Sequence, residues 1–280
     1  MIEVQGVTFK YDKITALNNV SIQIEKGLKY AILGANGAGK TTFLLHLNGI
    51  LRPLSGKIFY DGTEVTYDHK SLVKLRKRVG VVFQDPEAQL FSATVAEDVS
   101  FGPMNLSLSL DEVKQRVDDA LHACGIYELK ERPTHSLSHG QKKLAAIAGV
   151  IAMKPQVIVL DEPLAGLDPR HKDMVLKIFA SLNAGGVTLL MSTHNVDLAY
   201  EWADRVIVMN DGAIAANGTP FEIFSGNNQY ISKPVVLEIY QRLLLCGFLK
   251  DDKRIPRLKD ELIDDIEGAA LNLPQGGAPP

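Results

Sequence analysis

The chain has 280 residues, 46% of them hydrophobic and 22% charged, which is ordinary for a globular protein of one large domain or two smaller ones. Its formal net charge of −3 argues against nucleic acid as the main partner, because nucleic-acid-binding proteins usually carry a clearly basic surface. No apolar run approaches the roughly 20 residues that span a bilayer, and no export signal is recognisable at the N-terminus. Cys124 and Cys246 lie far apart without metal-ligand spacing, so we interpret them as free thiols of an intracellular protein.

Short β-strands are predicted for the first part of the chain. Apolar and polar residues alternate over 20–25, the pattern of a half-buried strand, and residues 30–33 form an apolar strand that runs into a glycine-rich turn. The apolar spacing over 40–51 predicts a helix that Gly49 ends. Farther along, a basic helix precedes a strand at 79–83.

Helical patterns then dominate, and we interpret residues 86–155 as a helical insert within an α/β domain. Strands and helices alternate after it, which predicts a parallel sheet covered by helices. The predicted elements of the middle and later chain are the helices 110–122, 139–153, 169–182 and 196–203 and the strands 157–160, 188–191 and 206–209. Residues 219–222 fit a capped helix start, 232–249 a C-terminal helix, and 273–280 a disordered tail rich in proline and glycine.

The most specific motif lies between a predicted strand and a predicted helix. Residues 34–41 read GANGAGKT and match the pattern G-x-x-x-x-G-K-[ST] in full. Glycines in such a loop let backbone N–H groups converge on phosphate oxygens at a helix N-terminus, the lysine reaches the β- and γ-phosphates, and the threonine hydroxyl serves Mg²⁺. The alternative is an ordinary glycine-rich turn. The residues predicted to bind ATP here are Asn36, Gly37, Ala38, Gly39, Lys40, Thr41 and Thr42.

Two carboxylates directly follow the apolar strand 157–160. In open α/β sheets, ligands bind at the carboxyl ends of the strands. Asp161 is therefore placed to hold Mg²⁺, together with Thr41, and Glu162 is placed to polarise a water toward the γ-phosphate. The alternative is a solvated acidic pair after a strand.

A third motif narrows the class of nucleotide-binding protein. Residues 137–141 read LSHGQ at the start of a predicted helix, whose N-terminus can face an anion and for which Ser138 is a good N-cap. Alone, this pattern indicates only a capped helix. Following the other two motifs, it resembles the signature of the ABC ATPase family, usually Leu-Ser-Gly-Gly-Gln, and the resemblance implies that Ser138, Gly140 and Gln141 bind ATP.

Four further residues match that family in the expected order. The resemblance implies that Tyr11 stacks on adenine and that Gln84 links Mg²⁺ and the attacking water to a membrane partner. It also implies that Asp168 belongs to a loop coupling two ATP sites and that His194 contacts the γ-phosphate. Glu162, His194 and Gln84 would then be the catalytic residues. Each match has a simpler alternative: a strand aromatic, a polar loop residue, an N-cap and a turn histidine.

The family resemblance also implies an architecture. It covers residues 1–225 and implies a P-loop NTPase fold of the α/β class, with a mixed sheet, an N-terminal antiparallel β subdomain and the helical insert. Residues 226–280 would form a C-terminal helical extension. In this family the phosphate loop of one chain faces the signature helix of another, so a single set of motifs implies a second ATPase copy, identical or closely related.

Residues 83–103 resemble a particular branch, the energy-coupling-factor ATPases, which drive uptake of vitamins and transition-metal ions. This resemblance implies an integral membrane coupling subunit and a substrate-binding membrane subunit as partners, and a peripheral location on the cytoplasmic side of the cell membrane. Residues 137–153 look most like the cobalt/nickel (CbiO-type) members. A vitamin-importer ATPase and a soluble ATPase of iron–sulfur assembly are the alternatives.

The same segment contains the candidate docking surface. Phe91 and Phe101 would line a groove for a partner helix and Glu87 would meet a basic residue on it, unless the phenylalanines belong to the core and Glu87 is a solvated acid. Two residues depart from the family pattern: His139 replaces a glycine of the signature, and Leu144 stands where arginine is common.

Overall fold

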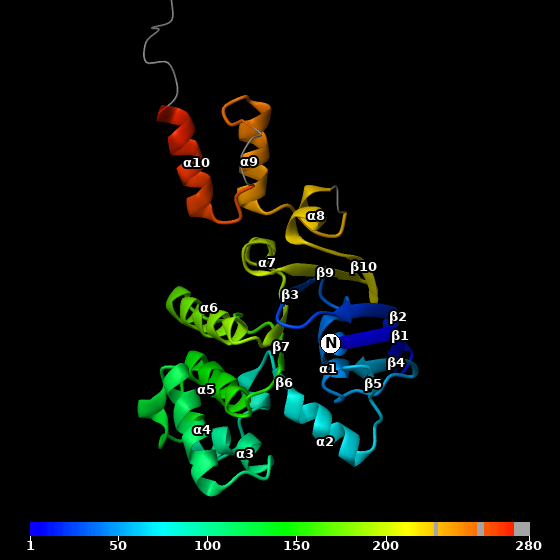
Figure 1. Ribbon diagram of the computed structural model, residues 1–280, viewed down its shortest axis with the longest axis vertical. Coiled ribbons are helices and arrows are strands. Elements are labelled where there is room, and N and C mark those ends of the chain that lie inside the picture. The colour runs from blue at the N-terminus through cyan, green and yellow to red at the C-terminus, as the bar shows by residue number, and fades with distance from the viewer. Residues whose placement is uncertain (227–228, 251–254, 272–280) are drawn as a thin grey trace, which may run out of the picture.

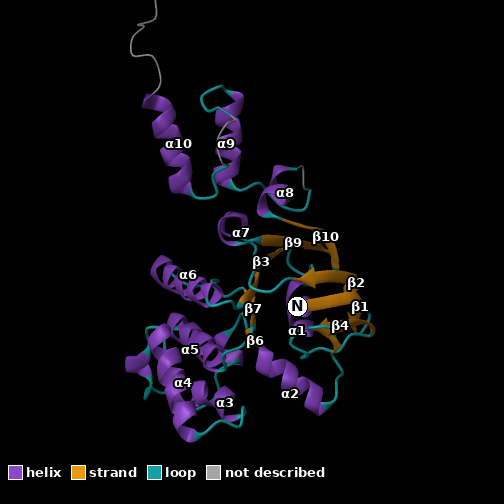
Figure 2. Ribbon diagram, viewed as in Figure 1, coloured by secondary structure: helices purple, strands orange, loops and turns teal. Residues whose placement is uncertain are grey.

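Two β-sheets of different character form the framework of the computed structural model, which describes residues 1–226, 229–250 and 255–271 (Figures 1 and 2). Within these residues, an antiparallel sheet has the strand order β2-β1-β4-β5, and a larger mixed sheet has the order β10-β9-β3-β8-β7-β6. The described neighbours in the larger sheet pair in parallel, except the antiparallel β9 and β10. The predicted mixed sheet and N-terminal antiparallel sheet are therefore confirmed.

The strands of the antiparallel sheet are β1 (Ile2–Tyr11), β2 (Ile14–Ile24), β4 (Ser55–Tyr60) and β5 (Thr63–Glu64). Those of the mixed sheet are β3 (Lys29–Leu33), β6 (Val79–Val82), β7 (Val157–Asp161), β8 (Thr188–Ser192), β9 (Arg205–Asn210) and β10 (Ala213–Gly218). The helices are α1 (Lys40–Leu47), α2 (His69–Arg78), α3 (Val95–Met104), α4 (Leu110–Ala123), α5 (His139–Ala152), α6 (Pro169–Ala184), α7 (Val196–Trp202), α8 (Pro220–Ser225), α9 (Val235–Leu245) and α10 (Lys259–Leu271).

The mixed sheet lies between two hydrophobic cores, which explains why β7 is apolar from Val157 to Leu160. Successive side chains of a strand point to opposite faces of the sheet. Ile158 and Leu160 pack into the core beneath α3–α6, whereas Val157 and Val159 pack into the core shared with α1 and the antiparallel sheet. A central strand with both faces covered needs apolar residues at every position.

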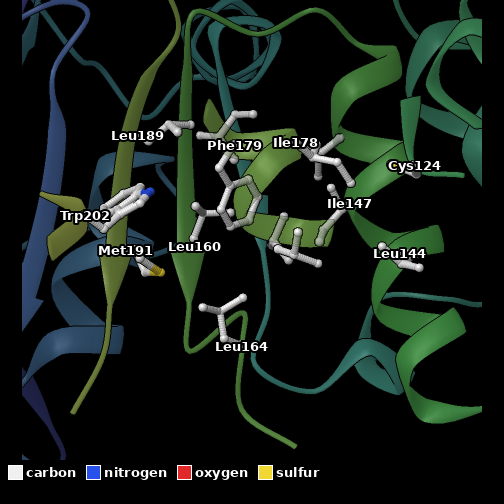
Figure 3. Close-up of a cluster of buried hydrophobic side chains, with 14 of the residues drawn as sticks. Cys124, Leu144, Ile147, Leu160, Leu164, Ile178, Phe179, Leu189, Met191 and Trp202 are labelled. Carbon is white, nitrogen blue, oxygen red and sulfur yellow. The ribbon is translucent and has the colours of Figure 1, made fainter. Parts of the chain in front are cut away.

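Phe179 of α6 packs in the first of these cores, close to Leu160 of β7 (Figure 3). Its side chain is fully buried. Replacing Phe179 with alanine is expected to lower the free energy of unfolding by about 3–5 kcal/mol, because the change removes buried apolar area and leaves a cavity. Urea unfolding followed by circular dichroism measures the change. Phe221→Ala removes the same atoms at an exposed position, and equal losses in both variants would contradict the core assignment.

Two helix predictions differ from the structure for local reasons, and one further helix was not predicted. The helix predicted over 40–51 ends at Leu47, because Gly49 adopts a positive φ of 71°. The helix predicted over 232–249 is α9, which begins after Pro234 and ends before Gly247, another residue with positive φ. Helix α10 was not predicted separately, and it packs against α9 around Tyr240, Leu249 and Leu262. The predicted tail at 273–280 lies outside the described residues. Within the described part of the chain, no helix is both long and apolar enough to cross a membrane.

Candidate nucleotide-binding and catalytic site

The glycine-rich loop joins β3 to α1 and lies tightly against neighbouring backbone. Gly39, the N-cap of α1, has a φ of 99°, and a Cβ there would lie 2.5 Å from the Ala16 carbonyl oxygen. Gly34 has a φ of 150°, and its Cβ would lie 2.3 Å from the Met209 carbonyl oxygen. Glycine at these positions therefore permits a close approach that any side chain would block. The loop ends where the free N–H groups of α1 begin, the place at which helices bind anions.

Lys40 reaches back into the loop that precedes it. Its side chain is mostly buried, and Nζ donates to the carbonyl oxygens of Gly34 at 2.8 Å and Ala35 at 3.1 Å. The ammonium thus lies inside the curve of the loop, beside the N-terminus of α1. A cation and converging amides in one concave loop are the combination that polyphosphate binding requires.

Asp161, at the carboxyl end of β7, accepts hydrogen bonds from two hydroxyl groups. Thr41 Oγ1 donates to Oδ2 at 2.7 Å, and Ser192 Oγ donates to Oδ1 at 2.6 Å. Oxygen ligands of this kind suit Mg²⁺, so Thr41 and Asp161 fit the predicted metal site. Ser192 was missed by sequence reasoning. The sequence signal for Ser192 is its place directly after the predicted strand 188–191. In the structure it ends β8 and pairs in register with Asp161.

Glu162 follows Asp161 with a backbone φ of 45°, which is unusual for a residue other than glycine. Its N–H donates to Ser192 Oγ at 2.9 Å. Its carboxylate Oε1 lies 3.2 Å from Nδ1 of His194, a residue that follows β8. The Glu162 side chain is mostly buried, whereas that of His194 is exposed. The structure therefore brings together the two side chains predicted to act at the γ-phosphate.

A cleft of about 810 Å³ contains most of the predicted site. Tyr11 lies at its edge with about half of its surface exposed, and Gln84 lines it after β6. The cleft also includes residues that sequence reasoning did not single out, among them Thr15 and Ala16 from the start of β2. The predicted residues that line the cleft are Tyr11, Asn36, Gly37, Ala38, Gly39, Lys40, Thr41, Thr42, Gln84, Asp161, Glu162 and His194.

The signature residues Ser138, Gly140 and Gln141 do not line this cleft. They form the start of α5, where the Gln141 N–H donates to Ser138 Oγ at 3.3 Å and the Ser138 N–H donates to Gln141 Oε1 at 3.1 Å. This capping box gives the helix a rigid N-terminus. The variant residue His139 lies against Gly166, since a Cβ there would be 3.2 Å from Nε2 of His139. Leu144, the other departure from the family pattern, is buried in the core, an environment that suits an apolar side chain (Figure 3).

Asp168 is also outside the cleft and acts as the N-cap of α6. Its carboxylate accepts from the His171 N–H at 3.0 Å and lies 2.6 Å from Nδ1 of the His171 ring. The backbone hydrogen bond and then the ring contact hold the pKa of Asp168 below its ordinary value. Within one chain Asp168 therefore has the simpler of its two predicted roles, and a role across a dimer stays a prediction.

The fold and the cleft define a P-loop nucleotide-binding protein: a glycine-rich loop, an Mg²⁺-type carboxylate and a neighbouring glutamate meet at the carboxyl edge of a mostly parallel sheet. Comparison with known proteins narrows this class. The sequence model of the family described as ABC transporter matches residues 17–165.

Two curated relatives are named energy-coupling factor transporter ATP-binding protein EcfA. The protein from Methanothermobacter thermautotrophicus is 44% identical over 90% of this chain and 83% of its own length. The one from Methanocaldococcus jannaschii is 50% identical over 80% of this chain and 81% of its own length. Among solved structures, cbiO1 from Clostridium perfringens, part of the ABC transporter complex cbiONQ, is 42% identical with a TM-score of 0.75, covering 88% of this chain and 96% of that one.

A dimeric ATP-binding cassette, MJ0796, in a post-hydrolysis state with ADP and phosphate, is 27% identical with a TM-score of 0.72, covering 79% of this chain and 99% of that one. The chain belongs to the ABC transporter ATPase family. The predicted fold, the ATPase activity and the resemblance to energy-coupling-factor ATPases are thereby confirmed.

Proposed function

We propose that this chain is the ATP-hydrolysing subunit of an energy-coupling-factor importer for cobalt or nickel ions, bound peripherally at the cytoplasmic face of the cell membrane. The observation that carries the ATPase part is the cleft in which Lys40, Asp161 and Glu162 meet. The metal-ion assignment rests on the resemblance of residues 137–153 to CbiO-type members and on the similarity to cbiO1.

The predicted site residues of the cleft have proposed roles in hydrolysis. The loop amides and Lys40 bind the β- and γ-phosphates, and Tyr11 stacks on the adenine. Thr41, Asp161 and Gln84 would hold Mg²⁺, which neutralises phosphate charge when bound. Glu162 orients a water and takes its proton as that water attacks the γ-phosphorus, while the bond from this phosphorus to the β–γ bridging oxygen breaks and ADP leaves. His194, beside Glu162, donates to a γ-phosphate oxygen and so stabilises the charge that develops there.

The separation of the two halves of the predicted site supports a dimer as the working unit. The phosphate loop lines the cleft, whereas Ser138, Gly140 and Gln141 cap a different helix outside it. We propose that the α5 N-terminus of a second copy, or of a close paralogue, covers the phosphates in this cleft. Hydrolysis would then remove the γ-phosphate that both chains contact and let them separate.

An exposed aromatic pair supports the proposed docking surface for a membrane partner. The residues Phe91 and Phe101 are 66% and 53% exposed, and their rings pack edge to face with centroids 4.8 Å apart. The alternative that they belong to the core is therefore wrong. Asp98 accepts from the backbone N–H groups of Phe91 and Ser92, which holds the pair in place. Glu87 already has a partner within the chain, Lys142 Nζ at 2.5 Å.

Exposed aromatics at a fixed site suit an apolar partner helix, because they add buried area without a large entropic cost. The double variant Phe91→Ser with Phe101→Ser is expected to lose the membrane subunits during purification from detergent-solubilised membranes, while its own ATPase activity is retained. Phe221→Ser, at another exposed phenylalanine, is the control and should retain them. Unchanged recovery by the double variant would contradict the docking surface.

The cargo is tested by uptake of radioactive cobalt or nickel into vesicles that contain the whole complex. Uptake that requires ATP and stops with the Glu162→Gln variant supports the metal-ion proposal. ATP-dependent uptake of a vitamin instead would show the alternative importer class. Recovery of the chain only in a soluble complex of iron–sulfur assembly factors would contradict an importer role altogether.

We also propose that residues 1–225 form the ATPase domain, with a helical subdomain at about 86–155, and that 226–280 form a separate extension. Helices α9 and α10 have a small apolar cluster of their own. Arg257 ties the extension to α7 by donating to the carbonyl oxygens of Tyr200 and Ala203. Leu237 of α9 is also buried in the main core, so the extension would be an appended unit that packs against the ATPase domain.

A further inference from the structure

A buried lysine next to the signature is unused by the mechanism above. Lys143, the fifth residue of α5, is only 1% exposed. Its Nζ donates to three carbonyl oxygens: those of Glu162 at 3.1 Å, Pro163 at 3.2 Å and Ala165 at 2.8 Å. An ammonium has three donors, so all three are satisfied. In the part of the chain that the structure describes, no carboxylate lies within ion-pair distance of this group.

Burying this cation costs free energy, because the ammonium loses its hydration. Burial lowers the pKa of Lys143 from its ordinary value, and the carboxylates of Glu162 and Asp161 act in the opposite direction. A buried charge is tolerated where hydrogen bonds replace the lost water, as the three carbonyls do here. A methionine or leucine would fill the same apolar space without the cost of desolvation. The position of the ammonium therefore points to a role beyond filling the core.

The three carbonyls belong to the turn that carries Glu162. The turn begins with the positive φ of Glu162, a conformation that is unfavourable for a residue other than glycine. Its carbonyl dipoles converge on one point, so they repel one another unless a donor lies between them. The Glu162 N–H donates to Ser192 Oγ, and the Glu162 carbonyl oxygen accepts from Lys143 Nζ and from the Ala165 N–H at 3.1 Å. These contacts fix the backbone from which the Glu162 side chain projects.

Lys143 also lies one turn beyond the capped start of α5, where Ser138 and Gln141 close the capping box. One rigid helix thus joins the signature to the turn of Glu162. The adjacent Lys142 points elsewhere, to Glu87.

Building on the proposed function, we propose that Lys143 is a positioning residue for hydrolysis. Its ammonium fixes the turn 162–165, and with it the Glu162 carboxylate, to the helix whose N-terminus receives the phosphates of the second chain. Binding of those phosphates at α5 would thereby help to set Glu162 in its own cleft, and this side chain would link the two ATP sites of a dimer.

The test is steady-state ATPase kinetics on the full-length chain. Lys143→Met keeps the apolar stem and removes the donors, and Lys143→Gln restores two of them. The methionine variant is expected to lose roughly 10- to 100-fold in kcat with the KM for ATP within about twofold, because a small misplacement of a catalytic group has effects of this size. The glutamine variant should recover part of the loss. Lys142→Met, which removes the neighbouring ammonium, should keep the wild-type rate.

Two results would overturn the proposal: a folded Lys143→Met protein with wild-type kcat, or equal losses in the Lys142 and Lys143 methionine variants. If the methionine variant fails to fold, the glutamine variant, which keeps two of the three donors, carries the test instead, and a wild-type kcat in it would then overturn the proposal. In the Glu162→Gln background, Lys143→Met should lower the residual rate no further, because both changes affect one group. If Glu162→Gln alone hydrolyses normally, the proposed base is wrong. If Glu162→Gln is inactive and the Lys143 variants are normal, only the positioning role fails.

Discussion

Replacing Glu162 with glutamine is expected to stop ATP hydrolysis while leaving ATP binding intact. Glutamine keeps the shape of the side chain but cannot accept the proton of the attacking water, and loss of a general base lowers kcat by roughly 100- to 10,000-fold. The phosphate loop is unchanged, since residues 34–41, including the Lys40 hydrogen bonds to Gly34 and Ala35, are unaffected by the substitution. ATP held by both chains would then keep them together.

Two measurements check this expectation. Phosphate release gives the rate, and size-exclusion chromatography with ATP and Mg²⁺ gives the fraction of dimer, which should rise in the Glu162→Gln variant. Glu128→Gln, at an exposed glutamate outside the cleft, is the matched control and should resemble the wild type in both. Normal hydrolysis by the Glu162→Gln variant would show that another group, or the substrate itself, accepts the proton.

A mixture of two inactive variants is expected to regain activity. Lys40→Ala should abolish ATP binding, because it removes the cation inside the phosphate loop. Ser138→Ala with His139→Ala should spoil the start of α5 and leave the cleft of its own chain untouched. In a dimer of one chain of each kind, one site combines both defects and the other combines an intact cleft with an intact signature.

Phosphate release is measured for each variant alone and for mixtures at increasing ratios of one to the other. At most one working site per dimer is expected, so the mixture should exceed both variants and stay below the wild type. No gain on mixing would contradict a site shared between chains, provided that chromatography shows mixed dimers. Recovery of full activity would contradict it as well, because the doubly defective site cannot work. Wild type mixed with excess Lys40→Ala, so that nearly every wild-type chain has a variant partner, serves as the reference for a dimer with one functional cleft.

How much of the site could be predicted depended on whether its residues are neighbours in the sequence. The phosphate loop is contiguous and its conformation depends on local geometry, so all of the residues predicted for it line the same cleft. Asp161 and Glu162 were predicted because a buried parallel strand is apolar throughout and its carboxyl end is where ligands bind. The close approach of Glu162 to His194 required the order β8-β7 in the sheet, which no local pattern contains.

Ser192 and Lys143 were missed for the same reason. Ser192 contacts Asp161 only because β8 pairs with β7 in one particular register. In the sequence, Lys142 and Lys143 are two adjacent lysines with nothing to distinguish them. Only the structure shows that Lys142 pairs with Glu87 and that Lys143 is buried and donates to the turn 162–165. The helix ends show the opposite case: Gly49 was recognised as a helix terminator, yet the predicted end was four residues too late.

The class of chemistry follows from the amino-acid sequence alone, because backbone conformation, phosphate affinity and metal preference are properties of short segments such as 34–41 and of single residues such as Asp161. Which side chains act together depends on how the whole chain packs. Strand order and helix packing bring distant residues within hydrogen-bond distance, and they place Ser138 and Lys40 of one chain at separate sites. The physical reason is that contacts across a core depend on the mutual packing of all its elements, whereas a loop or a cap depends on a few adjacent residues.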